Sequence, residues 1–451
     1  MANFEQHPLG CLHQPNDKSP ITNAKHPKAI PAIKRLKAFF ITVSFGGGFF
    51  GFNLLLLTFV TLGIGNTSRI FTVPYRIGFV LFSLVYIIYG ISKRSFVNLR
   101  LLWLPLLTFW LLYSIQIAWD GYLDPIYLGM PPLEYIQRAI GMTCIPMFIF
   151  LNRLGDAGNK WAFRAMWLTV LGCCLYSLVY YREAIEVGYR QSKYGNDVNV
   201  AYLSTIMVSY FGVIAFCIAV QRLSISLLEK VSMFKKIYLL GACFVGLVVL
   251  FLGGTRSALI ASILVPGIIF ISSTGKRNFA LKIKIFMMFV FISFIFFFAM
   301  EHFGAEMTRR YDGMITGLSE GSTEVGGGRP LLYKDTLLQI LESPAWGSCL
   351  ELKTIHFYPH NHILEAFMAT GVLGGVSFLI LSWTAIKRCF KILRQKREYG
   401  WIACLFLIFF LKGLFSGSII GSHLWFSMMA VYSVPLEKKN FTNPLDQGFE
   451  D

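Results

Sequence analysis

One long polar segment contains two residues whose types suit chemistry on an anionic substrate. Arg329 follows the three glycines at 326–328 and precedes Pro330, and His360 lies further along the same segment. Proline favours the first position of a helix, so Arg329 is expected at a helix N-terminus, where free N–H groups and the dipole attract an anion. Histidine titrates near neutral pH and can accept a proton. The segment predicts an anion site beside a base, although a surface arginine and an interfacial histidine bonded to backbone are the ordinary alternatives.

A second arginine stands between two apolar stretches. Arg256 follows Gly253, Gly254 and Thr255 and precedes Ser257, with almost no loop around it. One explanation is an arginine that snorkels from a helix end to the membrane surface. The other is an anion ligand at the mouth of a cavity, because a planar guanidinium suits phosphate. We predict the second role, since so tight a hairpin could use a residue that is cheaper to place than arginine.

Further polar residues are candidate contacts to a sugar. Residues 182–199 include Arg190 and Asn199 at the mouth of a predicted helix, and such side chains hydrogen-bond hydroxyl groups. Asn361 and His362 follow the predicted base directly, so His362 is an alternative base. Glu365, one helical turn on, could orient a histidine or bind a hydroxyl. A metal site at the histidines is not predicted, because few carboxylates lie near them and no known ligand spacing appears.

The elements that carry these residues are membrane helices. Hydrophobic residues make up 55% of the 451-residue chain and charged residues only 14%, whereas a soluble domain carries about 25% charged residues. Apolar runs close to the length of a bilayer crossing recur throughout, and their continuity favours helices over a barrel. We predict an all-α polytopic membrane protein with twelve spans, near residues 38–63, 77–92, 101–119, 135–151, 161–181, 199–220, 236–254, 257–274, 283–300, 362–384, 401–418 and 421–435.

Two of these spans carry a local irregularity. The glycines at 46–48 could break the first span. Only the short segment 416–418 separates the last two spans, which could instead form a re-entrant pair. Both irregularities depend on how glycine and serine residues are packed, which the sequence leaves open.

Charge sets the predicted orientation. The net charge is +17, and its distribution follows the excess of lysine and arginine in cytoplasmic loops rather than a nucleic-acid surface. The prediction is a cytoplasmic basic tail at 1–37, helices over 38–300, an outer loop at 301–361, helices over 362–435 and a cytoplasmic tail at 436–451. Arg256, Arg329 and His360 then share the outer face.

The motifs around these residues resemble the bacterial O-antigen ligases and the related O-antigen and exopolysaccharide polymerases. The matching pieces are Gly254-Thr255-Arg256-Ser257-Ala258-Leu259, Gly328-Arg329 with its helix, Glu342-Ser343-Pro344 before Trp346-Gly347, His360-Asn361 before Leu364-Glu365, Gly371-Val372-Leu373-Gly374-Gly375 and Gly195-Asn196-Asp197-Val198-Asn199. The resemblance implies a metal-independent inverting glycosyltransferase, without a cofactor, in the bacterial inner membrane. Its site would be periplasmic, its donor a glycan on undecaprenyl diphosphate, and its acceptor the lipid A–core oligosaccharide.

The resemblance also assigns roles. His360 takes the place of the catalytic histidine, and Arg256 and Arg329 take those of the diphosphate-binding arginines. Many ligases have another histidine two residues earlier, where this chain has Tyr358; His362 is additional here. The expected partners are the two lipid-linked glycans and membrane lipids, with no nucleic acid.

Alternatives to a ligase are a polymerase of the same family, whose acceptor is another lipid-linked glycan, and a flippase or transporter. A transporter keeps ionisable groups near the bilayer midplane. Arg138 and Lys412 are the candidates for such groups, and both are expected near helix ends. A membrane scaffold would explain neither outer arginine.

Overall fold

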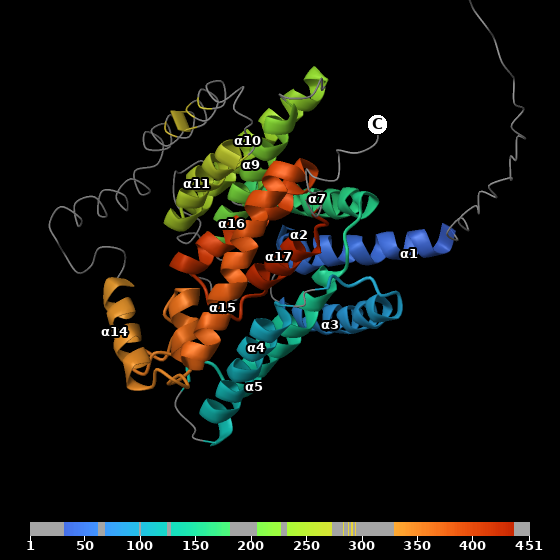
Figure 1. Cartoon of the computed structure of the whole chain (residues 1–451). Helices are drawn as coiled ribbons and strands as arrows, with labels where there is room; N and C mark the ends of the chain where they lie inside the picture. Colours follow the sequence, from blue (N-terminus) through green and yellow to red (C-terminus); the bar gives the residue numbers. More distant parts are fainter. Residues whose placement is uncertain are drawn as a thin grey trace, which may run out of the picture.

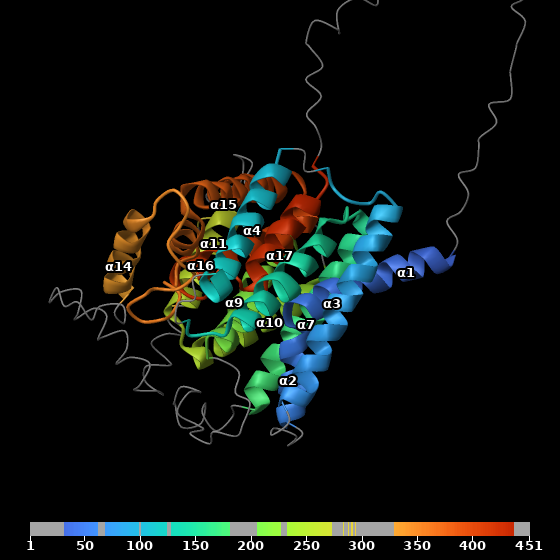
Figure 2. The same ribbon diagram turned by 90° about the horizontal axis from the view of Figure 1, so that it is seen from below.

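The structure is a computed structural model. It describes residues 31–61, 68–98, 101–123, 128–180, 205–226, 232–272 and 329–436, together with the single positions Ile283, Met287, Val290, Phe291 and Phe294. Within these residues the backbone is helical, and strand pairing is limited to two isolated bridges, Phe96 with Asn152 and Leu352 with Phe357. Helices pack around one another in a bundle (Figures 1 and 2), which is an all-α architecture.

The helices and their bounds are as follows: α1 (Pro31–Thr42), π-helical η1 (Val43–Gly51), α2 (Phe52–Thr61), α3 (Ser68–Ser92), α4 (Trp103–Ala118), η3 (Trp119–Leu123), α5 (Pro132–Ile136), η4 (Gln137–Cys144), α6 (Ile145–Met147), η5 (Phe148–Leu151), α7 (Asp156–Tyr180), α9 (Thr205–Ser226), α10 (Met233–Gly253), α11 (Arg256–Ser272), α14 (Arg329–Glu342), α15 (His362–Gln395), η8 (Arg397–Tyr399), α16 (Gly400–Phe415) and α17 (Ser422–Ser433).

Seven helical segments in the described part of the chain are long and apolar enough to cross a membrane, and α11 is a shorter apolar helix. The chain is therefore an all-α membrane protein. Each predicted span except 283–300 contains a described helix, while that span lies almost wholly outside the described residues. The count of twelve spans and their orientation remain predictions. Residues 1–30 and 437–451 lie outside the described part, and α1 already begins at Pro31, ahead of the predicted start of the first span.

The glycines at 46–48 do not break the first helix. They lie in η1, where the helix widens into a π-helical stretch and continues into α2. The hydroxyl of Tyr75 on α3 donates to the carbonyl of Gly47 at 2.9 Å. Any side chain at position 48 would collide with the ring of Phe79, also on α3. The glycines thus let a neighbouring helix approach the backbone closely, and a widened helix meets that need without a chain break.

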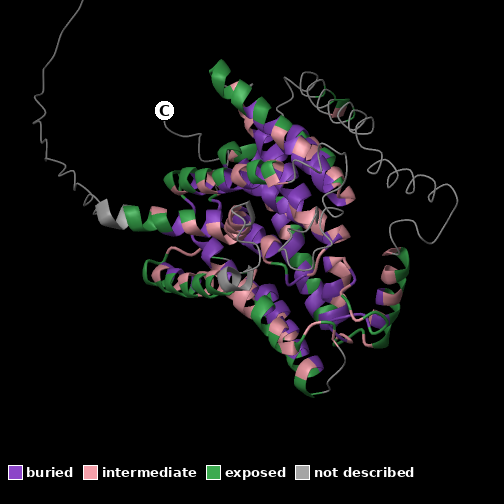
Figure 3. Ribbon diagram, turned by 180° about the vertical axis from the view of Figure 1, so that it is seen from behind, coloured by how far each residue is buried: buried purple, intermediate pink, exposed green. Residues whose placement is uncertain are grey.

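Buried side chains gather where α9, α15, α16 and α17 meet (Figure 3). Trp401 and Trp425 are among the largest of them. Exposed apolar residues follow the outer side of α3 at helical spacing, including Ile77, Leu81 and Ile88. Such a stripe would be unfavourable in water, but it is the expected surface of a helix that faces lipid.

Helix α15 contains a kink that fastens the loop before it. Gly371 has φ 62° and ψ −166°, a conformation that is essentially restricted to glycine. The kink allows the N–H of Val372 to donate to the carbonyl of Pro344 at 2.8 Å, and the carbonyl of Met368 to accept from the N–H of Ser348 at 2.8 Å. The loop after α14 is therefore docked against α15 at residues 368–372.

The connection between α16 and α17 is short, and α17 is buried along its length. At a rise of 1.5 Å per residue, the 12 residues of α17 extend about 18 Å, well short of a hydrocarbon core of about 30 Å. The segment Arg397–Phe415, by contrast, is among the seven that are long enough to cross, so the re-entrant alternative for the last two helices stays a prediction.

Candidate active site

The loop between α14 and α15 is anchored to distant helices by two buried carboxylates. The first is Asp120 in η3, which is only 1% exposed. Its carboxylate accepts from the side-chain amide of Gln116 at 2.7 Å and from the N–H of Leu350 at 2.7 Å. Bonds to a charged acceptor are stronger than neutral ones, so this contact fixes the middle of the loop.

The second carboxylate is Glu351 in the loop itself. It accepts from the hydroxyl of Tyr135 on α5 and from the N–H of Gly129 at 2.7 Å. Both carboxylate oxygens of Glu351 therefore have donors, one from the chain before α5 and one from α5 itself. Together with Asp120, Glu351 fixes the loop segment that precedes His360.

His360 lies at the end of this loop in a left-handed backbone conformation, with φ 58°. Such a conformation is uncommon for a residue other than glycine and is often found at functional sites. The imidazole is half-buried beside two rings, with centroids 5.3 Å from Phe357 and 4.8 Å from Tyr358. Its Nδ1 is buried and has no hydrogen-bond partner among the described residues. An interfacial histidine held by the backbone through Nδ1 is therefore not what the structure shows.

Electrostatics favour the neutral form of this imidazole. Burial and, second, the positive charge of Arg329 lower the pKa of His360 below its ordinary value. A neutral imidazole carries a free lone pair, so the residue can accept a proton over most of the physiological pH range.

Arg329 is the first described residue of α14, and the helix ends at Glu342. The predicted N-terminus before it stays a prediction, because the preceding glycines lie outside the described residues. The helix lies at the outside of the bundle, beside the start of α15 (Figures 1 and 2). Its orientation could not be foreseen: Leu331, Leu338 and Leu341 are exposed, whereas Gln339 is buried. An outward apolar face is typical of a helix that lies in a membrane interface.

One carbonyl connects α14 to the histidine loop. The C=O of Leu414, at the end of α16, accepts from the hydroxyl of Tyr333 on α14 at 3.3 Å and from the side-chain amide of Asn361 at 3.3 Å. The oxygen of Asn361 accepts from the N–H groups of Ile363 and Leu364 and caps α15. Asn361 therefore positions its neighbour His360, and its predicted contact with a sugar stays a prediction.

Arg256 lies where the sequence placed it, at the first residue of α11 directly after α10. Gly254 ends α10 in the left-handed conformation, φ 58°, which allows the abrupt turn. The hydroxyl of Ser209 on α9 accepts from the N–H of Thr255 at 3.1 Å. The Oγ1 of Thr255 is buried and has no partner within the described residues. The tip of the hairpin is thus fixed to α9.

Tyr210 on α9 contacts the hairpin that carries Arg256 and also lies within the electrostatic reach of Arg329. Its hydroxyl lies 3.0 Å from the hydroxyl of Ser257, the neighbour of Arg256. The charge of Arg329 also acts on Tyr210, as it does on His360. The charge of Arg329 therefore acts on the histidine and on the tyrosine that contacts the hairpin carrying Arg256.

A third cation lies on the same tyrosine. The ammonium of Lys412 stands 5.0 Å from the centroid of the Tyr210 ring and 3.5 Å from the sulfur of Met207. Lys412 is in the last turn of α16, where the helix dipole favours a positive charge. Arg138 lies in the continuous helical run that begins with α5 at Pro132 and passes into η4 at Gln137. Where the two residues lie relative to the bilayer midplane stays a prediction.

His362 and Glu365 are buried in α15. His362 is 6% exposed, and its ring lies against Gly413, where any Cβ would meet Nδ1. Glu365 accepts from the hydroxyl of Ser418 at 2.5 Å and from the N–H of Ile419 at 2.8 Å. Its carboxylate therefore holds the connection between α16 and α17 rather than a histidine. Of the two candidate bases, His360 is the more accessible.

Two predicted contacts, Arg190 and Asn199, lie outside the described residues. Within the described part of the chain, no three histidine, cysteine, aspartate or glutamate residues are grouped as metal ligands would be. Sequence reasoning missed Asp120, Glu351 and Tyr210. An acid directly after the apolar run 101–119 was a weak signal for Asp120, whereas nothing local distinguishes Tyr210 from other tyrosines.

The fold and the site define a class: an all-α membrane protein in which the charge of one arginine, Arg329, acts both on a half-buried histidine and on a tyrosine that carries a lysine over its ring. Residues 241–379 match the family described as O-Antigen ligase. This region includes Arg256, Arg329 and His360, and it confirms the resemblance to the O-antigen ligase and polymerase family. No curated protein and no solved structure matches the chain.

Proposed function

We propose that this protein is an O-antigen ligase, which moves a glycan from undecaprenyl diphosphate to a sugar hydroxyl of the lipid A–core oligosaccharide on the periplasmic face of the inner membrane. The family match supports ligases and polymerases alike. The observation that carries the proposal is the half-buried His360, whose Nδ1 has no partner among the described residues and whose pKa is lowered first by burial and second by the charge of Arg329.

The proposed reaction uses each group once. Arg256 and Arg329 bind the diphosphate and stabilise the negative charge that develops as the bond from the anomeric carbon to the phosphate oxygen breaks. His360 accepts the proton of the acceptor hydroxyl while its oxygen forms the new bond to that carbon. A single displacement inverts the anomeric configuration, and undecaprenyl diphosphate leaves. The cations take the part that a metal ion plays in other transferases, so no cofactor is required.

Lys412 fits the same scheme as a third cation. It lies over Tyr210, whose hydroxyl meets Ser257 beside Arg256. An ammonium is a compact point charge and suits a phosphate oxygen without requiring the planar geometry of arginine. The second role available to Lys412, compensation of the α16 dipole, does not conflict with the first.

The test uses purified protein with undecaprenyl diphosphate-linked glycan and lipid A–core as substrates. His360→Ala should reduce transfer by about 10²–10⁴-fold, the usual contribution of a general base, without lowering the thermal midpoint of unfolding. His356→Ala is the matched control, because His356 is in the same loop and also has a positive φ. Near-normal transfer by the His360 variant would exclude His360 as the base.

A strain lacking the protein separates the ligase from the polymerase. Full-length glycan chains that remain on the carrier lipid indicate a ligase. Single repeat units attached to the core indicate a polymerase and would refute the specific reaction proposed here.

A further inference from the structure

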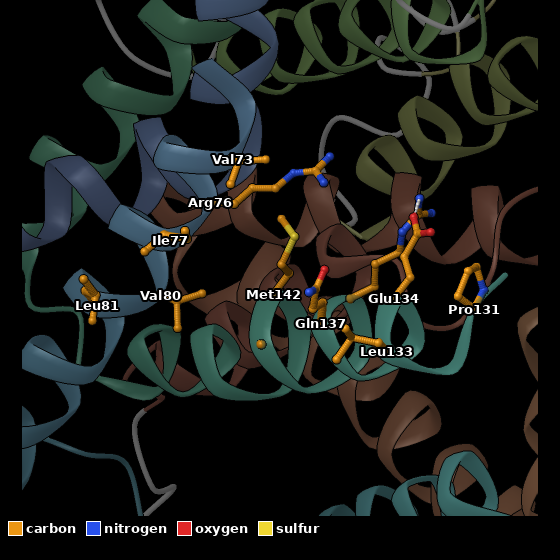
Figure 4. A pocket seen from close by; sticks show the side chains of 12 residues that line it. Val73, Arg76, Ile77, Val80, Leu81, Pro131, Leu133, Glu134, Gln137 and Met142 are labelled. Carbon is orange, nitrogen blue, oxygen red and sulfur yellow. Dashed lines mark hydrogen bonds and ion pairs between the residues drawn. The ribbon is translucent and has the colours of Figure 1, made fainter. Parts of the chain in front are cut away.

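A groove separate from the cationic hairpin, which is the turn between α10 and α11 that carries Arg256, lies between α3 and the α5–η4 helix (Figure 4). It has a volume of about 490 Å³. Most of its lining is apolar, with Val73, Ile77 and Leu81 from α3 and Leu133 and Met142 from the opposite side. Ile77, Leu81 and Leu133 are exposed on the outer surface of the bundle. A lipid chain can therefore reach the groove from the surrounding bilayer.

The polar part of the groove carries two arginines, Arg76 and Arg138. Arg138 forms an ion pair with Glu134 one turn earlier. Arg76 lies over the ring of Phe52, with its guanidinium carbon 5.6 Å from the centroid, and makes no ion pair with a described residue. Two arginines against one glutamate leave a net positive charge beside an apolar channel. This combination matches an amphiphile that has a hydrocarbon chain and a phosphate group.

The groove leads to the histidine loop. A second hollow, of about 310 Å³, shares Arg76, Arg138 and Met142 with the groove and continues to Tyr358 and Ser418. The ring of Tyr358 lies 4.8 Å from that of His360, and the charge of Arg138 acts on Tyr358. An amphiphile whose phosphate lies at the two arginines would therefore extend its polar part toward the base.

The cationic hairpin and the groove approach His360 from different helices. Arg256, Tyr210 and Lys412 belong to α11, α9 and α16, and Arg329 belongs to α14. The groove belongs to α3, α5 and η4. A transfer between two lipid-linked molecules needs two such approaches, because donor and acceptor must meet at the base while both chains remain in the membrane.

We infer that the groove defined by Val73, Ile77, Leu81, Leu133 and Met142, with Arg76 and Arg138, binds the acyl chain and phosphate of the acceptor glycolipid. This inference rests on the proposed ligase reaction. The donor diphosphate has the stronger cationic site at Arg256, Arg329 and Lys412. Glu134 already pairs with Arg138, so the groove suits a singly esterified phosphate better than a diphosphate.

Two variants test the groove, each with a matched control. Gly141 lines it, and a Cβ at this position would meet no atom within 4 Å, so Gly141→Leu fills the groove without a backbone collision. Gly78 on α3 is equally open but does not line the groove, so Gly78→Leu is its control. Arg76→Gln removes the unpaired charge, and Arg164→Gln is its control, because Arg164 also lies over an aromatic ring, 5.7 Å from the centroid of Trp161.

Binding is measured on the purified full chain in neutral detergent, with diphosphoryl lipid A, its dephosphorylated form and undecaprenyl diphosphate as probes. Gly141→Leu should weaken binding of both forms of lipid A. Arg76→Gln should weaken binding of the phosphorylated form by about tenfold, the effect of one lost charge-assisted contact, and leave the dephosphorylated form unchanged. The affinity of undecaprenyl diphosphate for every variant should stay within about twofold of its affinity for the wild-type protein. The affinity of lipid A for the two control variants should likewise stay within about twofold of the wild-type value.

Three results would overturn the inference. Weaker binding of undecaprenyl diphosphate by the groove variants would assign the groove to the donor, or to a polymerase acceptor. Equal displacement of lipid A by phosphatidylglycerol would make it a general phospholipid site. Unchanged binding of every probe would remove it as a site.

The outcome is separable from that of the proposed function. If the wild-type protein transfers glycan but the groove variants keep the wild-type KM for the acceptor, the groove assignment fails and the ligase proposal stands. If lipid A binding depends on the groove but the wild-type protein transfers nothing, the ligase proposal fails.

Discussion

Replacing Asp120 by asparagine tests whether a carboxylate far away in sequence holds the histidine loop in place. The side chain is buried and accepts from Gln116 and from the N–H of Leu350, each at 2.7 Å. Asparagine has nearly the same size but presents an NH₂ group to one of these donors. Asp120→Asn therefore breaks one hydrogen bond without creating a cavity.

The expected destabilisation of the docked loop follows from these contacts. Loss of one hydrogen bond to a charged acceptor costs about 1.5–3 kcal/mol, and a buried donor left without a partner adds about 1–3 kcal/mol. Rotation of the Gln116 amide would recover part of this lost free energy, but it would break the 3.4 Å bond from that amide to the carbonyl of Ser348. We therefore expect about 2–3 kcal/mol, which corresponds to a change of roughly 30–150-fold in the opening equilibrium of the loop.

Amide hydrogen exchange of residues 343–361 measures this opening directly. Exchange should accelerate by that factor, and kcat should fall by up to about 10²-fold because the base leaves its position. Glu342→Gln is the matched control. Glu342 pairs with Lys353 at 2.7 Å on the surface, and such pairs contribute only about 0–1 kcal/mol. Unchanged exchange in the Asp120 variant, or lost activity without faster exchange, would refute the anchoring argument.

Three further variants address the base, the kink and the third cation. Because Arg329 lowers the pKa of His360, the neutral base persists to lower pH; Arg329→Gln should move the acidic limb of the kcat/KM profile to higher pH, and an unmoved limb would contradict the coupling. Gly371→Ala should lower the thermal midpoint of unfolding, because its Cβ would lie 2.2 Å from the carbonyl oxygen of Ala345 in the docked loop. Its φ of 62° adds a strain of about 1–3 kcal/mol for a residue other than glycine. Gly241→Ala, where a Cβ meets open space, should leave the midpoint unchanged or higher. Lys412→Gln should raise KM for the lipid-linked donor about 10-fold and leave KM for the acceptor unchanged, whereas equal effects on both would count against a diphosphate contact.

The sequence determined those parts of this protein that depend on neighbouring residues. Apolar runs predicted the helices because each must satisfy its own backbone in lipid. The pattern after Arg329 and Pro330 predicted the helix α14, and the tight segment around Arg256 predicted the hairpin between α10 and α11. These features follow from local backbone preferences, so they can be recognised without knowing which helices are neighbours.

Only the tertiary structure decided which residues share the site and how each is used. Burial separates His362 from the more accessible His360, although both belong to one short motif. The contacts of Asp120 with Leu350 and of Tyr210 with Ser257 join segments far apart in the chain. The outward leucine face of α14 likewise depends on what lies beside the helix rather than on its pattern. Burial, pairing and charge coupling are set by the packing of distant helices, and the order of residues along the chain does not encode them locally.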